Sequence, residues 1–165
     1  MRTKSSIGFW LAAACQVLIV LTYVGIKEWT MRSGRDVVLA TRPVDPRDVF
    51  RGDYVTLAYE VSRLDRCWIG VVGEDVYVPL RSQGEKWVAG YPARTYAEAA
   101  GQGEVVMVGK VNNRTTDQCN VIYGIESYYV PQGTGAAIER VRGQLHVRVA
   151  VDGFGNAVIK ELIMP

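Results

Sequence analysis

Charged side chains that could take part in chemistry are concentrated between residues 42 and 53. Arginines and aspartates alternate through this stretch, as Arg42, Asp45, Arg47, Asp48, Arg51 and Asp53. Neighbouring carboxylates can act as acid and base in glycoside hydrolysis. The arginines and prolines between these aspartates instead favour salt bridges within a turn. We therefore predict a charged structural corner here, with binding of a peptide or partner protein as the alternative.

Other residue types that commonly carry catalysis form no recognisable set. The only histidine, His146, falls on the outward face of a predicted strand, and no Cys/His cluster has zinc-ligand spacing. The sequence contains no G-x-S-x-G nucleophile motif. No serine lies in a motif that marks the nucleophile and desolvated lysine of a serine–lysine enzyme. We predict no enzymatic activity, no metal site and no cofactor.

The three cysteines differ in their surroundings. Cys15 lies within an apolar segment, where a thiol acts as a small apolar side chain. Cys67 and Cys119 fall in the C-terminal part, where an oxidising compartment would allow a disulfide. Their pairing would close a loop of about 50 residues. We predict this disulfide, with two buried free thiols as the alternative.

The elements that position these residues begin with an apolar segment near the N-terminus. Residues 7–26 carry no charge, and a helix of this length spans about 30 Å, the thickness of the hydrocarbon core of a bilayer. Arg2 and Lys4 precede it, which places the short head in the cytoplasm and the C-terminal part outside. We predict a cytoplasmic head at residues 1–6, a transmembrane helix at 7–26 and a connector at 27–36.

A cleaved signal peptide is the alternative to this anchor. Its apolar core would be about 7–15 residues long, which is shorter than the segment observed. Residues 11–15 (Leu-Ala-Ala-Ala-Cys) resemble a lipoprotein cleavage box, but the apolar stretch continues well past Cys15. We therefore predict an uncleaved anchor in contact with lipid. Gln16 is either a hydrogen-bonding contact to another transmembrane helix or a tolerated amide.

Residues 37–165 show short apolar or alternating segments separated by Gly, Pro, Asn and Asp, which is typical of antiparallel strands and turns. The expected fold is mainly β, a sheet or sandwich with one short helix at 135–142 and another helical turn at 97–100. Strands are expected at 37–41, 54–61, 75–81, 86–91, 104–111, 121–130 with a bend at Gly124, 145–151 and 157–163. The strands at 75–81 and 86–91 are expected to form a hairpin around 82–85, and the last two strands a hairpin around a turn at 152–156. Net charge is only +2 with acids and bases interspersed, which argues against nucleic acid as a partner.

Residues 52–59 read Gly-Asp-Tyr-Val-Thr-Leu-Ala-Tyr. This segment resembles the GDYXXLXY family of bacterial membrane-anchored proteins, and all five specified positions match. The later segment Tyr123–Pro131 also fits, although Gln132 stands where a glutamate commonly follows in the family. The resemblance implies an anchored extracytoplasmic domain and supplies no catalytic residues. We expect the chain in the bacterial cytoplasmic (inner) membrane, with its C-terminal domain in the periplasm.

These observations favour an accessory subunit of a larger membrane complex, with other transmembrane subunits as partners. Energy-transducing assemblies, respiratory or photosynthetic, are natural hosts by analogy. An anchored module that binds or senses an envelope ligand is the alternative, and a hydrolase with an unfamiliar site is a weaker third. Arginine and tyrosine are enriched at interfaces. The predicted interaction residues are Arg42, Asp45, Arg47, Arg51, Asp53, Tyr54, Tyr59, Glu126, Tyr128 and Tyr129.

Overall fold

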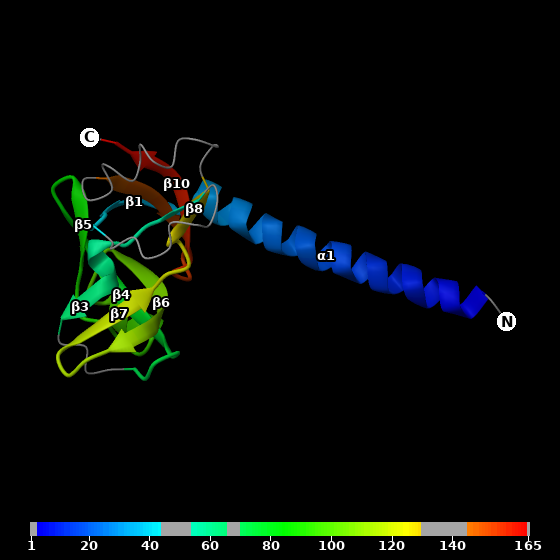
Figure 1. Cartoon of the computed structure of the whole chain (residues 1–165), viewed down its shortest axis with the longest axis horizontal. Helices are drawn as coiled ribbons and strands as arrows, with labels where there is room; N and C mark the ends of the chain where they lie inside the picture. Colours follow the sequence, from blue (N-terminus) through cyan, green and yellow to red (C-terminus); the bar gives the residue numbers. More distant parts are fainter. Residues whose placement is uncertain (1–2, 44–53, 66–69, 130–144, 165) are drawn as a thin grey trace.

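The computed structural model describes residues 3–43, 54–65, 70–129 and 145–164 (Figure 1). Within these ranges a long N-terminal helix is followed by antiparallel sheets and a short helix, which confirms the predicted fold class. Some predicted features lie outside the described residues: the helix at 135–142, and Asp45, Arg47, Asp48, Arg51, Asp53 and Cys67.

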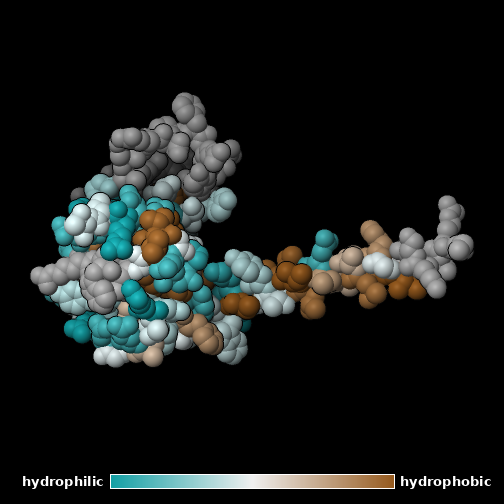
Figure 2. All heavy atoms as spheres, turned by 90° about the horizontal axis from the view of Figure 1, so that it is seen from below, coloured by the Kyte–Doolittle hydropathy of each residue, from teal (hydrophilic) through white to brown (hydrophobic). Residues whose placement is uncertain are grey.

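Helix α1 (Thr3–Ser33) projects away from the β domain. Its large apolar side chains from Ile7 to Ile26 are each more than half exposed, and Figure 2 shows brown, hydrophobic spheres along much of the helix. A helix that is apolar all round normally lies in a large core or in a membrane. The segment Ile7–Ser33 is long enough and apolar enough to cross a bilayer.

The helix does not end at Ile26. It continues to Ser33, and the first strand begins at Arg35. The range predicted as a connector, 27–36, therefore holds the last two turns of α1, a single junction residue and the start of the sheet. The charged residues at 27, 28 and 32 are compatible with helix and do not break it.

Within the described ranges, ten strands form three antiparallel sheets. They are β1 (Arg35–Ala40), β2 (Tyr54–Thr56), β3 (Arg63–Asp65), β4 (Asp75–Gln83), β5 (Lys86–Ala89), β6 (Val105–Arg114), β7 (Gln118–Ile122), β8 (Ser127–Tyr129), β9 (His146–Val151) and β10 (Ala157–Ile163). Their orders are β1-β9-β10, β2-β8 and β3-β7-β6-β4-β5. One cluster of buried apolar side chains joins all three sheets, with Leu39 of β1, Val55 of β2 and Met107 of β6 as examples.

Two predicted hairpins are confirmed. Strands β4 and β5 pair through a turn at Gly84 and Glu85, where Gly84 has a φ of +67° that favours glycine. Strands β9 and β10 pair through the predicted turn at 152–156, and a bulge at Lys160 shifts the register of β10. The alternation of apolar residues along β9 was sufficient to predict its buried face.

Two predicted strands differ in the structure. The segment 54–61 pairs as a strand only through Thr56, forms an isolated bridge at Tyr59 and ends in a 3-10 helix, η1 (Glu60–Ser62). Its predicted alternation still holds, because Val55, Leu57 and Tyr59 are all buried. The segment 121–130 is not one bent strand: β7 ends at Ile122, and a separate strand, β8, begins at Ser127.

The break at Gly124 separates strands that belong to different sheets. β7 pairs with β3 and β6, whereas β8 pairs with β2. Gly124 has a φ of +79°, and the Glu126 carboxylate accepts a hydrogen bond from the Tyr123 backbone N–H at 2.7 Å. A left-handed glycine and a side chain that satisfies the freed amide end β7 at this point.

The helical turn predicted at 97–100 is present as α2 (Tyr96–Ala100). Thr95 caps it by accepting a hydrogen bond from the Glu98 N–H through its hydroxyl oxygen at 3.3 Å. Ala99 is buried with Ala93 and Val106 in a second, smaller apolar cluster. α2 thus covers part of the face of β4 and β6 that points away from the main core.

Candidate functional site

The junction between α1 and the β domain consists of one residue. The Gly34 N–H donates to the Thr30 carbonyl at 2.9 Å, and β1 starts at the next residue. A Cβ at Gly34 would lie 2.5 Å from the Thr30 carbonyl oxygen and 3.0 Å from the Val151 backbone N. Only glycine allows the helix end and β9 to approach this closely, so the junction is packed rather than flexible.

A side-chain contact strengthens this junction. The Thr30 hydroxyl lies 2.9 Å from Asp152 Oδ2, and Thr30 is buried. Asp152 Oδ1 accepts from the backbone N–H groups of Phe154 and Asn156, each at 2.9 Å. One carboxylate therefore holds both the β9–β10 turn and the last turns of α1. Sequence reasoning found the turn but not its contact with the helix.

The hydrogen bonds of Asp152 predict an effect of acid on the junction. Partial burial opposes the charged carboxylate, but the bonds from Asn156, Thr30 and the turn backbone outweigh it and hold the pKa of Asp152 below its usual value. This contribution to stability is therefore present above the ordinary carboxyl pKa of about 3.9 and is lost as the pH falls through the lower folded value.

We expect unfolding in urea, followed from pH 7 to pH 3, to show a smaller acid loss in an Asp152→Asn variant than in the wild type. The variant should already be less stable at pH 7, because an amide supports the turn less well than a carboxylate. Identical acid slopes for the two proteins would contradict this role of Asp152.

The motif at 52–59 supplies core residues. Leu57 and Tyr59 are buried, and the Tyr59 hydroxyl donates to the Ile125 carbonyl at 2.6 Å. The Leu57 N–H donates to the Glu126 carbonyl at 2.7 Å. Gly52 and Asp53 lie outside the described residues, and the structure places Tyr54 in β2, paired with Tyr129. The described part of the motif thus ties the edge of the domain to the segment after Gly124.

Tyr123 makes the reciprocal contact, from the segment near Gly124 back to the segment that follows Tyr59. It is buried, and its hydroxyl donates to the Val61 carbonyl at 2.7 Å. Burial raises the pKa of Tyr59 and of Tyr123 far above the usual value, and the nearby charge of Glu126 raises both further. Both phenols are therefore protonated donors, and neither can act as a base near neutral pH.

The predicted interaction residues consequently separate into different roles. Tyr59 and Glu126 hold the fold together. Tyr128 is half-buried against the core, whereas Tyr129 is 80% exposed. Gln16 lies exposed on α1. Of the charged corner, only Arg42 is among the described residues, and it lines a pocket.

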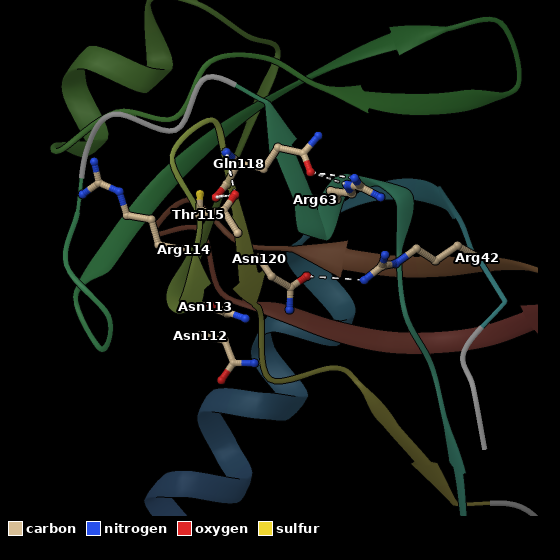
Figure 3. A pocket seen from close by; sticks show the side chains of 9 residues that line it. Arg42, Arg63, Asn112, Asn113, Arg114, Thr115, Gln118 and Asn120 are labelled. Atoms are coloured by element: carbon tan, nitrogen blue, oxygen red, sulfur yellow. Dashed lines mark hydrogen bonds between the residues drawn. The ribbon is translucent and has the colours of Figure 1, made fainter. Parts of the chain in front are cut away.

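This pocket lies over the polar face of the edge of the five-stranded sheet (Figure 3). In the strand register, Arg63 of β3 is opposite Asn120 of β7, and Asn120 is opposite Asn113 of β6. Opposite residues share a face, so the register places these three side chains in one row. The pocket has a volume of about 270 Å³. Its lining residues are Arg42, Arg63, Asn112, Asn113, Arg114, Thr115, Gln118, Cys119 and Asn120.

Each arginine in this pocket donates to a neutral oxygen. Arg42 Nη2 lies 3.5 Å from Asn120 Oδ1, Arg63 Nη2 lies 2.6 Å from Gln118 Oε1, and Arg114 Nη1 lies 2.9 Å from the Gly70 carbonyl. We call the pocket that these three arginines line the arginine pocket. Sequence reasoning found only Arg42, because the other two lie 21 and 72 residues further along the chain and only strand pairing brings them near it.

Cys119 is disulfide-bonded, and Cys15 is a free thiol. The predicted partner, Cys67, lies outside the described residues. We expect a Cys119→Ser variant to lose about 2–4 kcal/mol in its free energy of unfolding, the contribution of a cross-link over about 50 residues. A Cys15→Ser variant should match the wild type, and peptide mass spectrometry without reduction should recover the 67–119 pair. Alkylation of Cys119 in the unreduced protein would contradict the prediction.

No group of His, Cys, Asp or Glu that could hold a metal occurs among the described residues. A family model described as GDYXXLXY protein matches residues 16–162 of the chain. No curated protein and no solved structure matches it. The family model covers α1 from Gln16 onward, the junction, the buried Leu57 and Tyr59, and the arginine pocket. The chain therefore belongs to the GDYXXLXY protein family.

Proposed function

We propose that this protein is a non-enzymatic, single-span accessory subunit of a larger membrane complex. In this role α1 crosses the bacterial cytoplasmic membrane with its N-terminus inside, and the β domain lies on the periplasmic surface. The observation that carries the proposal is the rigid junction between the helix and the sheet.

The length of α1 supports this placement. Residues 7–26 match the hydrocarbon core, and residues 27–33 add about 10 Å of helix at 1.5 Å per residue. This extension is enough to cross the headgroup layer, so the domain would lie directly above the lipid. Trp29 is 72% exposed, and Lys27 Nζ lies 5.9 Å from the centre of the Tyr23 ring. An aromatic and a basic side chain are typical of that interface.

The packed junction supports the subunit role. A domain that captures ligands on its own gains reach from a flexible linker. Here the junction residue is Gly34, and the Thr30–Asp152 contact ties α1 to the β9–β10 turn. A subunit contacts its partner chains through both its membrane helix and its aqueous domain. A fixed orientation of the domain on α1 allows both contacts to form at the same time.

Co-purification with mass spectrometry tests the proposal. The full chain, extracted in several mild detergents, should migrate in native electrophoresis above its own mass and carry the same membrane proteins each time. A Gly-Ser-Gly-Ser insertion after Ser33 should weaken this association, while the same insertion at the β4–β5 turn should not. Migration of the wild type alone in every detergent would count against a subunit role.

The alternative is a membrane-anchored module that binds or senses an envelope ligand or peptide. The arginine pocket favours it, because Figure 1 places β3 and the β6–β7 hairpin at the end of the domain away from α1. A pocket there faces the aqueous compartment rather than the lipid. This role and the subunit role are compatible, because they use different surfaces: the arginine pocket would bind the ligand, and α1 with the adjoining face of the domain would contact other subunits.

A further inference from the structure

The arginines of the pocket have no ion-pair partner among the described residues, a property that they share with Arg81, which donates to the Gln102 carbonyl elsewhere on the sheet. Arg35, Lys86, Lys110, Arg148 and Lys160 each pair with a carboxylate within 4 Å. Among the described residues, no carboxylate forms an ion pair with Arg42, Arg63 or Arg114. Their recorded side-chain partners are one asparagine, one glutamine and one carbonyl. Arg42 and Arg63 thus place two positive charges on the same side of the pocket, whereas Arg114 points away from them toward the Gly70 carbonyl (Figure 3).

Arg42 also has an incompletely bonded guanidinium. Its Nε is buried and has no hydrogen-bond partner among the described residues. A buried donor without a partner is unfavourable, and more so when it belongs to a charged group. The backbone holds the residue in place, because the Arg42 N–H donates to the Ala58 carbonyl at 2.9 Å. Because Nε itself is buried, an anion in the pocket would bind Arg42 through the terminal nitrogens of the guanidinium, and its negative charge would offset the unfavourable burial of this cation.

The amide side chains of the pocket accept hydrogen bonds from its arginines. Gln118 Oε1 accepts from Arg63, while Gln118 Nε2 donates to Asp65 Oδ1 at 2.7 Å. Gln118 therefore holds Asp65 beside the pocket, whose lining does not include this carboxylate. The asparagines can offer further N–H donors to a ligand. The volume of about 270 Å³ suits a compact group and is below the usual range for larger organic ligands.

We propose that the arginine pocket binds a compact oxyanion, a phosphate or carboxylate group, with Arg42 and Arg63 as its principal ligands. Planar guanidinium groups bind both kinds of anion through paired N–H donors. In the proposed topology the pocket lies away from α1 and the lipid surface, so the anion comes from the aqueous compartment rather than from a headgroup. The inference rests on the proposed binding role, and it is independent of the accessory-subunit role.

Calorimetric titration of the full chain in a neutral detergent tests this inference with two probes. One is inorganic phosphate, with sodium chloride at matched ionic strength as its control. The other is a short glutamate-rich peptide, compared with its glutamine counterpart. Binding of phosphate indicates a free anion, and binding of the acidic peptide alone indicates a carboxylate supplied by a partner protein. Either of these results supports the oxyanion site. If neither phosphate nor the acidic peptide binds, the proposal is overturned.

Variants locate the binding. Arg63→Gln, at an exposed side chain, should lower the affinity about 10–100-fold, the effect of removing a hydrogen bond to a charged group. Arg42→Gln should do the same, with a circular dichroism spectrum to verify folding. Arg81→Gln is the matched control, since Arg81 lies on the same sheet and donates to the Gln102 carbonyl outside the pocket. Equal affinities in all three variants would overturn the assignment of the anion site to this pocket. That outcome would leave the accessory-subunit proposal, which co-purification tests, unaffected.

Discussion

Replacing Tyr59 with alanine is expected to lower the free energy of unfolding by about 3–5 kcal/mol, the usual cost of removing a large buried aromatic ring. The Tyr59 side chain is fully buried and packs in the core that joins all three sheets. Its hydroxyl also holds the Ile125 carbonyl at 2.6 Å. Because a small domain has only about 5–15 kcal/mol of stability in total, the variant should unfold at a much lower urea concentration.

A conservative change separates the two contributions of Tyr59. Tyr59→Phe keeps the ring but removes the donor to a buried carbonyl, and we expect it to cost about 1–3 kcal/mol. Tyr129→Phe, at a ring that is 80% exposed, is the matched control and should change stability by less than about 0.5 kcal/mol. Urea unfolding of the full chain in detergent, followed by far-UV circular dichroism, measures all three. A Tyr59→Ala variant as stable as the control would show that the motif does not support the core.

Substitution of Gly34 by alanine is expected to open the junction between α1 and the β domain. The added Cβ would meet the Thr30 carbonyl oxygen at 2.5 Å and the backbone of Val151 at 3.0 Å, and none of these atoms can move without disturbing the helix end or β9. Overpacking of this kind costs about 2 kcal/mol. We expect the Thr30–Asp152 hydrogen bond to be lost together with the first pairing of β1.

Limited trypsin digestion reports this opening, because Arg32 and Arg35 flank the junction. Cleavage there should be about 30-fold faster in the Gly34→Ala variant if local opening is easier by about 2 kcal/mol. Gly25→Ala is the matched control: it lies on the same helix, and its added Cβ would have nothing within 4 Å. Equal cleavage rates in the two variants would contradict a rigid junction.

The sequence alone was sufficient to predict what depends on local pattern. The uncharged run at 7–26 predicted an apolar helix, and alternation along Val147 and Val149 predicted a buried strand face. The turn residues at 152–156 predicted the last hairpin. These predictions succeed because hydrophobic periodicity and glycine-rich turns depend on neighbouring residues only.

What the sequence could not predict depends on contacts between distant segments. Thr30 and Asp152 are separated by 122 positions, so nothing near either residue marks their hydrogen bond. The extension of α1 to Ser33 follows from docking against β9, because the charges at its end give no stop signal. Arg42 approaches Arg63 through the bridge between Thr41 and Tyr59 and the hydrogen bond from the Arg42 N–H to the Ala58 carbonyl, and the pairing of β3 with β7 adds Asn120 beside them.

The most direct test of the account is labelling from outside the cell of single introduced cysteines in a Cys15→Ser background. Glu85→Cys lies at the exposed turn between β4 and β5, and Ser5→Cys lies in the N-terminal head. In intact spheroplasts, a membrane-impermeant maleimide should label the Glu85→Cys variant at once and the Ser5→Cys variant only after lysis. The reverse pattern, or recovery of the uncleaved chain in the soluble fraction, would contradict a helix that crosses the membrane and holds the β domain outside.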